Sequence, residues 1–238
     1  MRNGRTSLSA VLLLVMAASA AAQEPTPRQE YEEASGRPKP APTIPSELRT
    51  MVAEATPDRL VVRGIGGQLI PVSLDWIEPI DFASHRDGRY LGFAITGYEV
   101  GGYTIIDRRG AGESAMIETG IAPVFSPDGR FFAAAETSDA AFGNLNGVAL
   151  WEVLPDRTVR RFFTDALPGS VDWRVDAWVR PDCVSVSSVE PGWAPPGGDD
   201  WEEAVRNAPR RHYGIDVREG VVMIDNHERL GCTGEDRP

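Results

Sequence analysis

Short apolar runs alternate with turn residues along most of the chain from about residue 59 onward. The runs are rich in Val, Ile, Phe and Tyr, and Gly, Pro and Asp lie between them. This pattern is typical of β-strands joined by tight turns, because positive or preset φ angles are needed where the chain reverses. The sequence therefore predicts an all-β domain over residues 46–238.

The apolar pattern repeats in units of four strands. We expect three four-stranded antiparallel meanders, at residues 77–119, 121–164 and 171–226, and a separate hairpin at residues 59–74. The first two units share an Asp-Gly-Arg turn, at Asp87 and at Asp128, so the repeat length there is 41 residues. A period of about 40 to 45 residues with four strands per unit is typical of propeller blades.

The stretch "VFSPDGRFFAAAE", which begins at Val124, resembles the repeat of periplasmic TolB-like β-propeller proteins, which are relatives of the WD-type repeats. The resemblance implies that the Ser-Pro-Asp-Gly turn links the two inner strands of a blade and has an architectural role. Closed propellers have about four to eight blades. Three units and one hairpin therefore predict a small or incomplete β-propeller, and a two-sheet β-sandwich is the alternative.

The N-terminal region predicts export from the cytoplasm. Arg2 and Arg5 precede an apolar run and then small residues, which is the order of a secretory signal peptide over residues 1–22. Residues 23–45 are rich in Pro and Glu, so we expect a disordered or extended tether there. A short helix capped by Ser46 is expected next. The predicted localisation is periplasmic or secreted.

The net charge is −11 for the whole chain, and it becomes −13 without residues 1–22, with 22 basic against 35 acidic residues. Nucleic-acid binding is not expected, because its affinity comes mainly from neutralising phosphates with basic side chains. Insertion into a membrane is not expected either, since no stretch outside the predicted signal peptide is apolar enough to cross a bilayer. The charge favours a basic protein partner or simple solubility. The sequence leaves the oligomeric state open.

No motif of known chemistry is present: the chain lacks nucleophile elbows, Walker loops, zinc-protease motifs and dinucleotide-binding glycines. The three histidines, His85, His212 and His227, have no spacing typical of a metal site. A general base would also need an orienting carboxylate and a cleft. We therefore expect no catalytic residue, no metal and no cofactor.

The most distinctive segment is an insertion at about residues 190–211, between the second and third strands of the third unit. A helix is expected over residues 200–208, with an apolar face that packs on the sheet as a clasp. The alternative is a binding surface for a partner or ligand, since Trp is favoured at such sites. Its candidate residues are Trp193, Trp201, Asp199, Asp200 and Glu202.

These features predict a non-enzymatic protein-binding module of the cell envelope. A narrower version is an inhibitor or immunity-type protein whose acidic loops neutralise a basic enzyme. A carbohydrate-binding or small-ligand-binding protein is one alternative, and an enzyme with an unrecognised site is another. Fold resemblance alone does not choose among them.

The two cysteines, Cys183 and Cys232, are expected to form a disulfide, because an exported protein meets an oxidising environment. Thiol titration of the denatured, unreduced protein should find no free thiol, and reduction should shift its electrophoretic mobility without revealing a dimer. The bond should contribute roughly 4 kcal/mol by restricting the unfolded chain. Two titratable thiols per chain would contradict the pairing.

Overall fold

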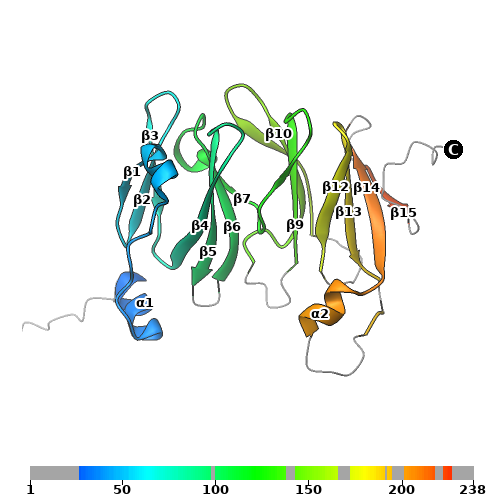
Figure 1. Ribbon diagram of the computed structural model, residues 1–238, viewed down its shortest axis with the longest axis horizontal. Helices are drawn as coiled ribbons and strands as arrows, with labels where there is room; N and C mark the ends of the chain where they lie inside the picture. The colour runs from blue at the N-terminus through cyan, green and yellow to red at the C-terminus, as the bar shows by residue number, and fades with distance from the viewer. Residues whose placement is uncertain are drawn as a thin grey trace, which may run out of the picture.

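The computed structural model describes residues 27–97, 100–137, 143–165, 172–190, 192–194, 201–217 and 222–226. Four antiparallel sheets stand side by side in a row (Figure 1). The first sheet has three strands and each of the other three has four. Each four-stranded sheet is a meander whose strands follow one another in chain order.

The first sheet follows a short 3-10 helix and contains the strands β1 to β3. Their bounds are η1 Ser46–Met51, β1 Val52–Ala55, β2 Arg59–Arg63 and β3 Leu69–Ser73. The second sheet contains β4 to β7, with a 3-10 turn before its last strand. Its elements are β4 Ile77–His85, β5 Tyr90–Gly97, β6 Val100–Asp107, η2 Gly112–Ala115 and β7 Met116–Glu118.

The third sheet contains β8 to β11. Its strands are β8 Val124–Phe125, β9 Phe131–Glu136, β10 Gly147–Val153 and β11 Thr158–Thr164. The fourth sheet contains β12 to β15 and has a helix between its second and third strands. Its elements are β12 Arg174–Arg180, β13 Cys183–Val189, α2 Trp201–Arg206, β14 Arg210–Asp216 and β15 Val222–Asn226.

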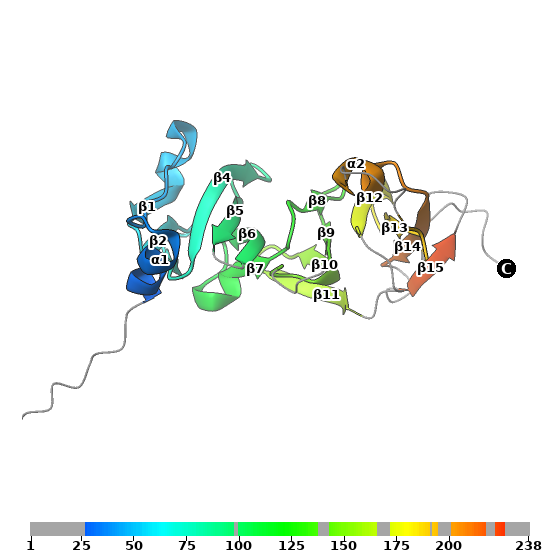
Figure 2. The ribbon, with the colours of Figure 1, turned by 90° about the horizontal axis from the view of Figure 1, so that it is seen from below.

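All three predicted four-stranded units are confirmed, and the fold is propeller-like. The sheets form a row in which the first and the fourth lie at opposite ends (Figures 1 and 2), so the described residues do not close a ring. The two-sheet sandwich is ruled out by the number of sheets. The hairpin at residues 59–74 is present as β2 and β3, but β1 joins it to make a three-stranded sheet.

The short helix predicted here forms as a 3-10 helix over Ser46–Met51, but the predicted cap is wrong. Ser46 is the first helical residue, Pro45 precedes it, and no side chain makes a capping hydrogen bond. Residues Val52–Ala55 then form a strand that pairs with β2. Ala and Glu in this strand favour helices, but a local preference of tenths of a kcal/mol per residue is overridden by pairing with a neighbouring strand.

The turn between β8 and β9 forms as the repeat predicts. The Gly129 amide donates to the Ser126 carbonyl at 2.8 Å, and the Ser126 hydroxyl donates to the Asp128 carboxylate at 2.8 Å. The Asp128 carboxylate also accepts from the Arg130 amide at 3.1 Å. Gly129 has a φ of +68°, a conformation that glycine adopts without strain.

Three apolar clusters hold neighbouring sheets together. The first lies between the first and second sheets, the second between the second and third, and the third between the third and fourth. Each cluster has a fully buried member: Phe93 in the first, Phe132 in the second and Leu150 in the third. The second and third sheets therefore bury apolar side chains on both faces, as strands inside a stack must.

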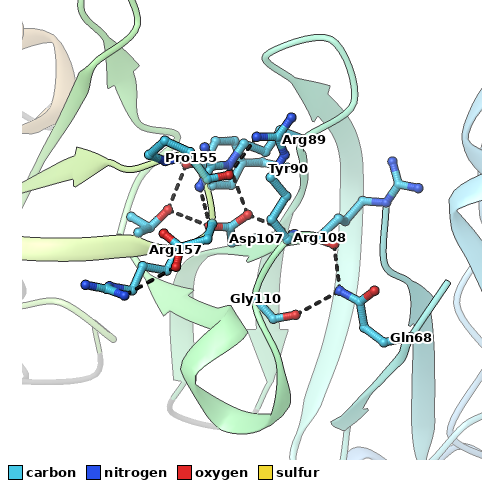
Figure 3. A network of polar contacts seen from close by, with 11 residues as sticks. Gln68, Arg89, Tyr90, Asp107, Arg108, Gly110, Pro155 and Arg157 are labelled. Carbon is cyan, nitrogen blue, oxygen red and sulfur yellow. Dashed lines mark hydrogen bonds and ion pairs between the residues drawn. The ribbon is translucent and has the colours of Figure 1, made fainter. Parts of the chain in front are cut away.

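A polar network at one rim joins the first three sheets (Figure 3). At its centre the buried Asp107 carboxylate accepts from the Arg89 guanidinium at 2.9 and 3.1 Å and from the Thr158 hydroxyl at 2.7 Å. Tyr90 bonds the same hydroxyl at 2.8 Å. On the other side, the Gln68 side-chain amide donates to the carbonyls of Arg108 and Gly110, at 3.0 Å each.

The expectation of a disordered or extended tether needs correction for its described part. Residues Pro27–Ser35 form the helix α1, and the Tyr31 hydroxyl donates to Glu78 on β4 at 2.7 Å. The buried Lys39 ammonium donates to the carbonyls of Leu74 and Asp75. These contacts bury Tyr31 and Lys39 against the first two sheets, and the Pro-rich and Glu-rich composition of the segment does not predict this packing. Among the described residues, no helix is long and apolar enough to cross a membrane.

Replacing Asp107 with Asn is expected to lower the free energy of unfolding by about 3 kcal/mol, because the Arg89 guanidinium stays largely buried without its counter-charge. Denaturant unfolding measures the change. The matched control is Asp156→Asn, whose ion pair with Arg157 is exposed, so its effect should stay within about 0.5 kcal/mol. Equal effects of the two changes would show that the network at Asp107 is not structural.

Candidate functional site

The fourth sheet ends the row, and its two faces differ in chemistry. Val184 and Val186 on β13 point into the apolar cluster shared with the third sheet. Ser185 and Ser187 alternate with them and therefore lie on the opposite face of the sheet, where both are buried. A β-bulge in β12 makes Asp176 an extra residue, and its carboxylate accepts from Ser185 at 3.3 Å and from Ser187 at 2.7 Å. Bulges commonly redirect a side chain in this way.

A connected set of ionic and polar side chains, most of them largely buried, lies on this face. The imidazole Nδ1 of His212 lies 3.0 Å from the Asp176 carboxylate. The Arg210 guanidinium donates to the Ser187 hydroxyl at 2.8 Å and also bonds Asp172. We call this set of Asp172, Asp176, Ser185, Ser187, Arg210 and His212 the terminal face. Its order comes from strand register, since His212 pairs with Ser187 and Arg210 with Val189.

The predicted insertion leaves and rejoins the sheet at the edge of the terminal face. Its base is closed by the Glu190 amide, which donates to the Pro209 carbonyl at 3.0 Å. The helix α2 is shorter than predicted, and Ala208 beyond it is buried. Ala204 and Val205 are half-buried and Glu203 is exposed, which follows the predicted apolar face. The geometry therefore agrees with a helix packed through that face.

The candidate binding residues of the insertion are only partly described. Trp193 is half-buried, and its amide donates to the Glu190 carbonyl at 3.1 Å. Asp199 and Asp200 lie outside the described residues. Trp201 and Glu202 begin α2, and the structure does not describe their side chains. The binding role of these five residues stays a prediction.

Sequence reasoning missed the terminal face because its residues are far apart along the chain. Asp176 and His212 are separated by 36 residues and meet only when β12, β13 and β14 pair. The alternation of Ser with Val in "CVSVSSV" was the available signal, since it predicts one polar face on a central strand.

The terminal face has one element of acid–base chemistry. A carboxylate that binds one imidazole nitrogen can orient a general base. However, Ser185 and Ser187 both bond the Asp176 carboxylate, so neither of these serines is placed as a nucleophile activated by His212. The described residues include no cluster of three or more His, Cys, Asp or Glu that could hold a metal ion.

The other two histidines have different positions. His85 lies between the second and third sheets, where its Nε2 is 3.0 Å from the Tyr103 hydroxyl and its ring lies 5.8 Å from that of Phe125. Burial lowers the pKa of His85, because a charged imidazole would lose hydration there. This histidine therefore acts as an intersheet contact. His227 lies outside the described residues.

The cysteines are tested only in part. Cys183 begins β13 and is buried, whereas Cys232 lies outside the described residues. The disulfide between them stays a prediction, and so does the signal peptide, whose residues 1–22 are also outside the described part of the chain.

No protein-family model and no curated protein matches the chain. Its assignment to the TolB-like or WD-type repeat proteins therefore stays a prediction. Several solved structures are similar at low levels, and the chain spans less than two thirds of each of the three named below. Hydrazine synthase of Kuenenia stuttgartiensis has 17% sequence identity and a TM-score of 0.35, and the match covers 73% of this chain and 50% of the other.

The other two structures are named as lactonases. A candidate 6-phosphogluconolactonase of Bacteroides fragilis has 11% identity and a TM-score of 0.36, with 72% of this chain and 52% of the other covered. The periplasmic gluconolactonase of Pseudomonas aeruginosa has 14% identity and a TM-score of 0.29, with 73% and 63% covered. Similarity at this level transfers neither activity nor substrate to this chain.

The lowered pKa of His85 predicts an acid-sensitive fold. As the pH falls through about 6.5, this histidine takes up a proton in the unfolded chain before it does so in the folded one, so the free energy of unfolding decreases. His85→Gln should make this decrease smaller between about pH 7.5 and pH 5.5, measured by urea unfolding. Tyr103→Phe should retain it, because burial causes the shift. An unchanged slope in His85→Gln would contradict the assignment.

Proposed function

We propose that the chain is a non-enzymatic protein-binding module of the cell envelope and that its partner docks on the exposed rim of the terminal face and the adjoining insertion. The observation that supports this proposal is the ordered polar network of the last sheet. The faces that pack between neighbouring sheets are apolar, whereas this one holds Asp176, Arg210 and His212, which are largely buried, beside the exposed Asp172 and Arg174 at its rim.

The terminal face is unsuited to receive a further sheet of the same kind. Stacking an apolar sheet on it would remove water from the charged rim residues Asp172 and Arg174 without adding partners, and that costs several kcal/mol per ion. A protein surface with complementary charges and hydrogen-bonding groups avoids this cost. At the rim, the side chains of Asp172 and Arg174 are 39% and 42% exposed and are accessible to such a surface.

The charge of the chain favours a basic partner. An acidic surface raises the rate at which a basic protein associates and suppresses acidic competitors. An inhibitor or immunity-type protein that covers a basic enzyme is the narrower form of this proposal. The predicted signal peptide supports an encounter outside the cytoplasm.

Two other functions are supported less well at this surface. Acid–base chemistry has the Asp176–His212 pair but lacks an activated serine among the described residues of this face. Carbohydrate binding through Trp193 and Trp201 stays an alternative, and the structure does not describe the side chain of Trp201. The charged rim of the terminal face supports protein binding.

Affinity capture from an envelope extract tests the proposal. The mature chain should retain one stoichiometric partner, and elution by salt should show its charge dependence. Reversing the exposed charges Glu190→Lys and Glu203→Lys together should weaken capture about tenfold, since both residues belong to the insertion that adjoins the terminal face.

The matched control reverses Glu47 and Glu113 to Lys, which are exposed on elements near the first and second sheets. It applies the same change in net charge away from the terminal face, so capture should persist. An equal loss of partner capture in both double variants would indicate a nonspecific effect of net charge. The absence of any stoichiometric partner would count against the protein-binding function itself.

A further inference from the structure

A cleft of about 430 Å³ lies between the second and third sheets, away from the terminal face. One wall is β7 with Met116 and Glu118, and the other is formed by β10 and β11 with Trp151, Arg160 and Phe163. Ligand pockets for small molecules occupy about 300 to 1,000 Å³, so the volume suits one small ligand.

A β-bulge places the residues of β11 in this cleft. Trp151 pairs with Arg160, while Leu150 pairs with Phe162, so Arg161 is the extra residue. Without the bulge, Arg160 and Phe163 would lie on opposite faces of the strand, because side chains alternate. With it, both line the cleft beside Trp151, and the Arg160 guanidinium lies 5.0 Å from the centre of the Phe163 ring.

The polar side chains of the cleft divide into two groups. Asn144 and Thr158 are engaged within the protein. Asn144 bonds the Gly120 amide and the Tyr103 carbonyl, at 2.9 and 3.2 Å. Thr158 donates to Asp107 in the rim network at 2.7 Å (Figure 3). These bonds fix the spacing of the two walls.

Glu118 and Arg160 form the second group. No ion pair joins these two side chains to each other or to another described residue, although the chain pairs many of its exposed arginines. Burial raises the pKa of the Glu118 carboxyl, because the surrounding walls displace water from it. The cleft thus presents one carboxylate and one guanidinium at its exposed mouth, each without a partner of opposite charge among the described residues.

The apolar surface between these two charges is aromatic. Trp151 is 4% exposed and stacks on Phe132, with ring centroids 5.0 Å apart, so it is a rigid wall. Met116 and Phe163 are 42% and 38% exposed at the mouth of the cleft. Aromatic surfaces of this kind favour apolar groups and the alkyl parts of polar ligands.

We propose that this cleft binds a small zwitterionic molecule with an apolar body, of the class of free amino acids and dipeptides. The ligand carboxylate contacts Arg160, its ammonium group contacts Glu118, and its apolar body packs against Trp151 and Phe163. Both charges of the ligand then meet a protein charge that has no ion-pair partner among the described residues, whereas a neutral or singly charged ligand makes at most one such contact.

Calorimetric titration with a defined set of probes tests this site. The set contains the amino acids leucine, phenylalanine and methionine and the dipeptides alanyl-phenylalanine and phenylalanyl-alanine. At least one should bind saturably with a Kd of about 1 mM or below. Its methyl ester, which lacks the carboxylate, and its N-acetyl derivative, which lacks the ammonium group, should each bind about tenfold more weakly.

Two variants assign the contacts. Arg160→Gln should weaken the zwitterion about tenfold and leave the ester unchanged, because the ester has already lost the group that Arg160 binds. Glu118→Gln should weaken the zwitterion and leave the N-acetyl derivative unchanged. Both variants should keep the melting temperature of the parent protein, since neither side chain has a described ion-pair partner.

The control is Arg161→Gln, which removes the neighbouring arginine paired with Glu152 outside the cleft. It should bind the zwitterion like the parent protein. Failure of every probe to bind would overturn the proposal, and so would binding that is equally strong in Arg160→Gln. Equal losses in Arg160→Gln and Arg161→Gln would also overturn it, because they would place the effect outside the cleft. These results leave the capture of a partner by the terminal face unaffected.

Discussion

Apolar contact between neighbouring sheets is the interaction on which the whole molecule depends. A single four-stranded meander cannot bury enough apolar surface to be stable, so each sheet must be covered by the next. The second and third sheets meet this requirement on both faces, and strands such as β9, with five consecutive buried residues, are the consequence. Such contacts join each sheet of the row to the next, and the first and fourth sheets, at its ends, each have a neighbouring sheet on one face only.

Polar bonds at the rim then set how the sheets are aligned. Asp107 is buried and receives donors from its own sheet and from β11 of the next one. Hydrogen bonds have directional geometry, whereas apolar contact does not, so this network selects one arrangement among those that apolar stacking permits. The same bonds hold Thr158 in the wall of the cleft, and the rim network therefore also shapes the proposed ligand site.

Both proposed sites arise where the regular strand pattern is interrupted. A bulge at Asp176 directs its carboxylate towards Ser185 and Ser187 on the terminal face. A second bulge, at Arg161, brings Arg160 and Phe163 to the same wall of the cleft. One extra residue changes which face the following side chains occupy, and it does so at little cost to the pairing of the remaining strand. The repeated sheet supplies stability, and these local irregularities supply the recognition surfaces.

The sequence by itself determined the strands, their grouping into four-stranded units and the Asp128-Gly129 turn, because alternation and turn residues are local properties. It did not determine the first strand, where Ala and Glu favour a helix. It also did not determine the helix α1, whose Tyr31 bonds the distant Glu78, or the burial of Lys39 against Leu74. Only the tertiary structure decided that the sheets form an open row, that Asp176 meets His212, and that Glu118 and Arg160 share a cleft. Such meetings depend on strand register and on the stacking of sheets, and both are set by contacts between residues far apart in the chain.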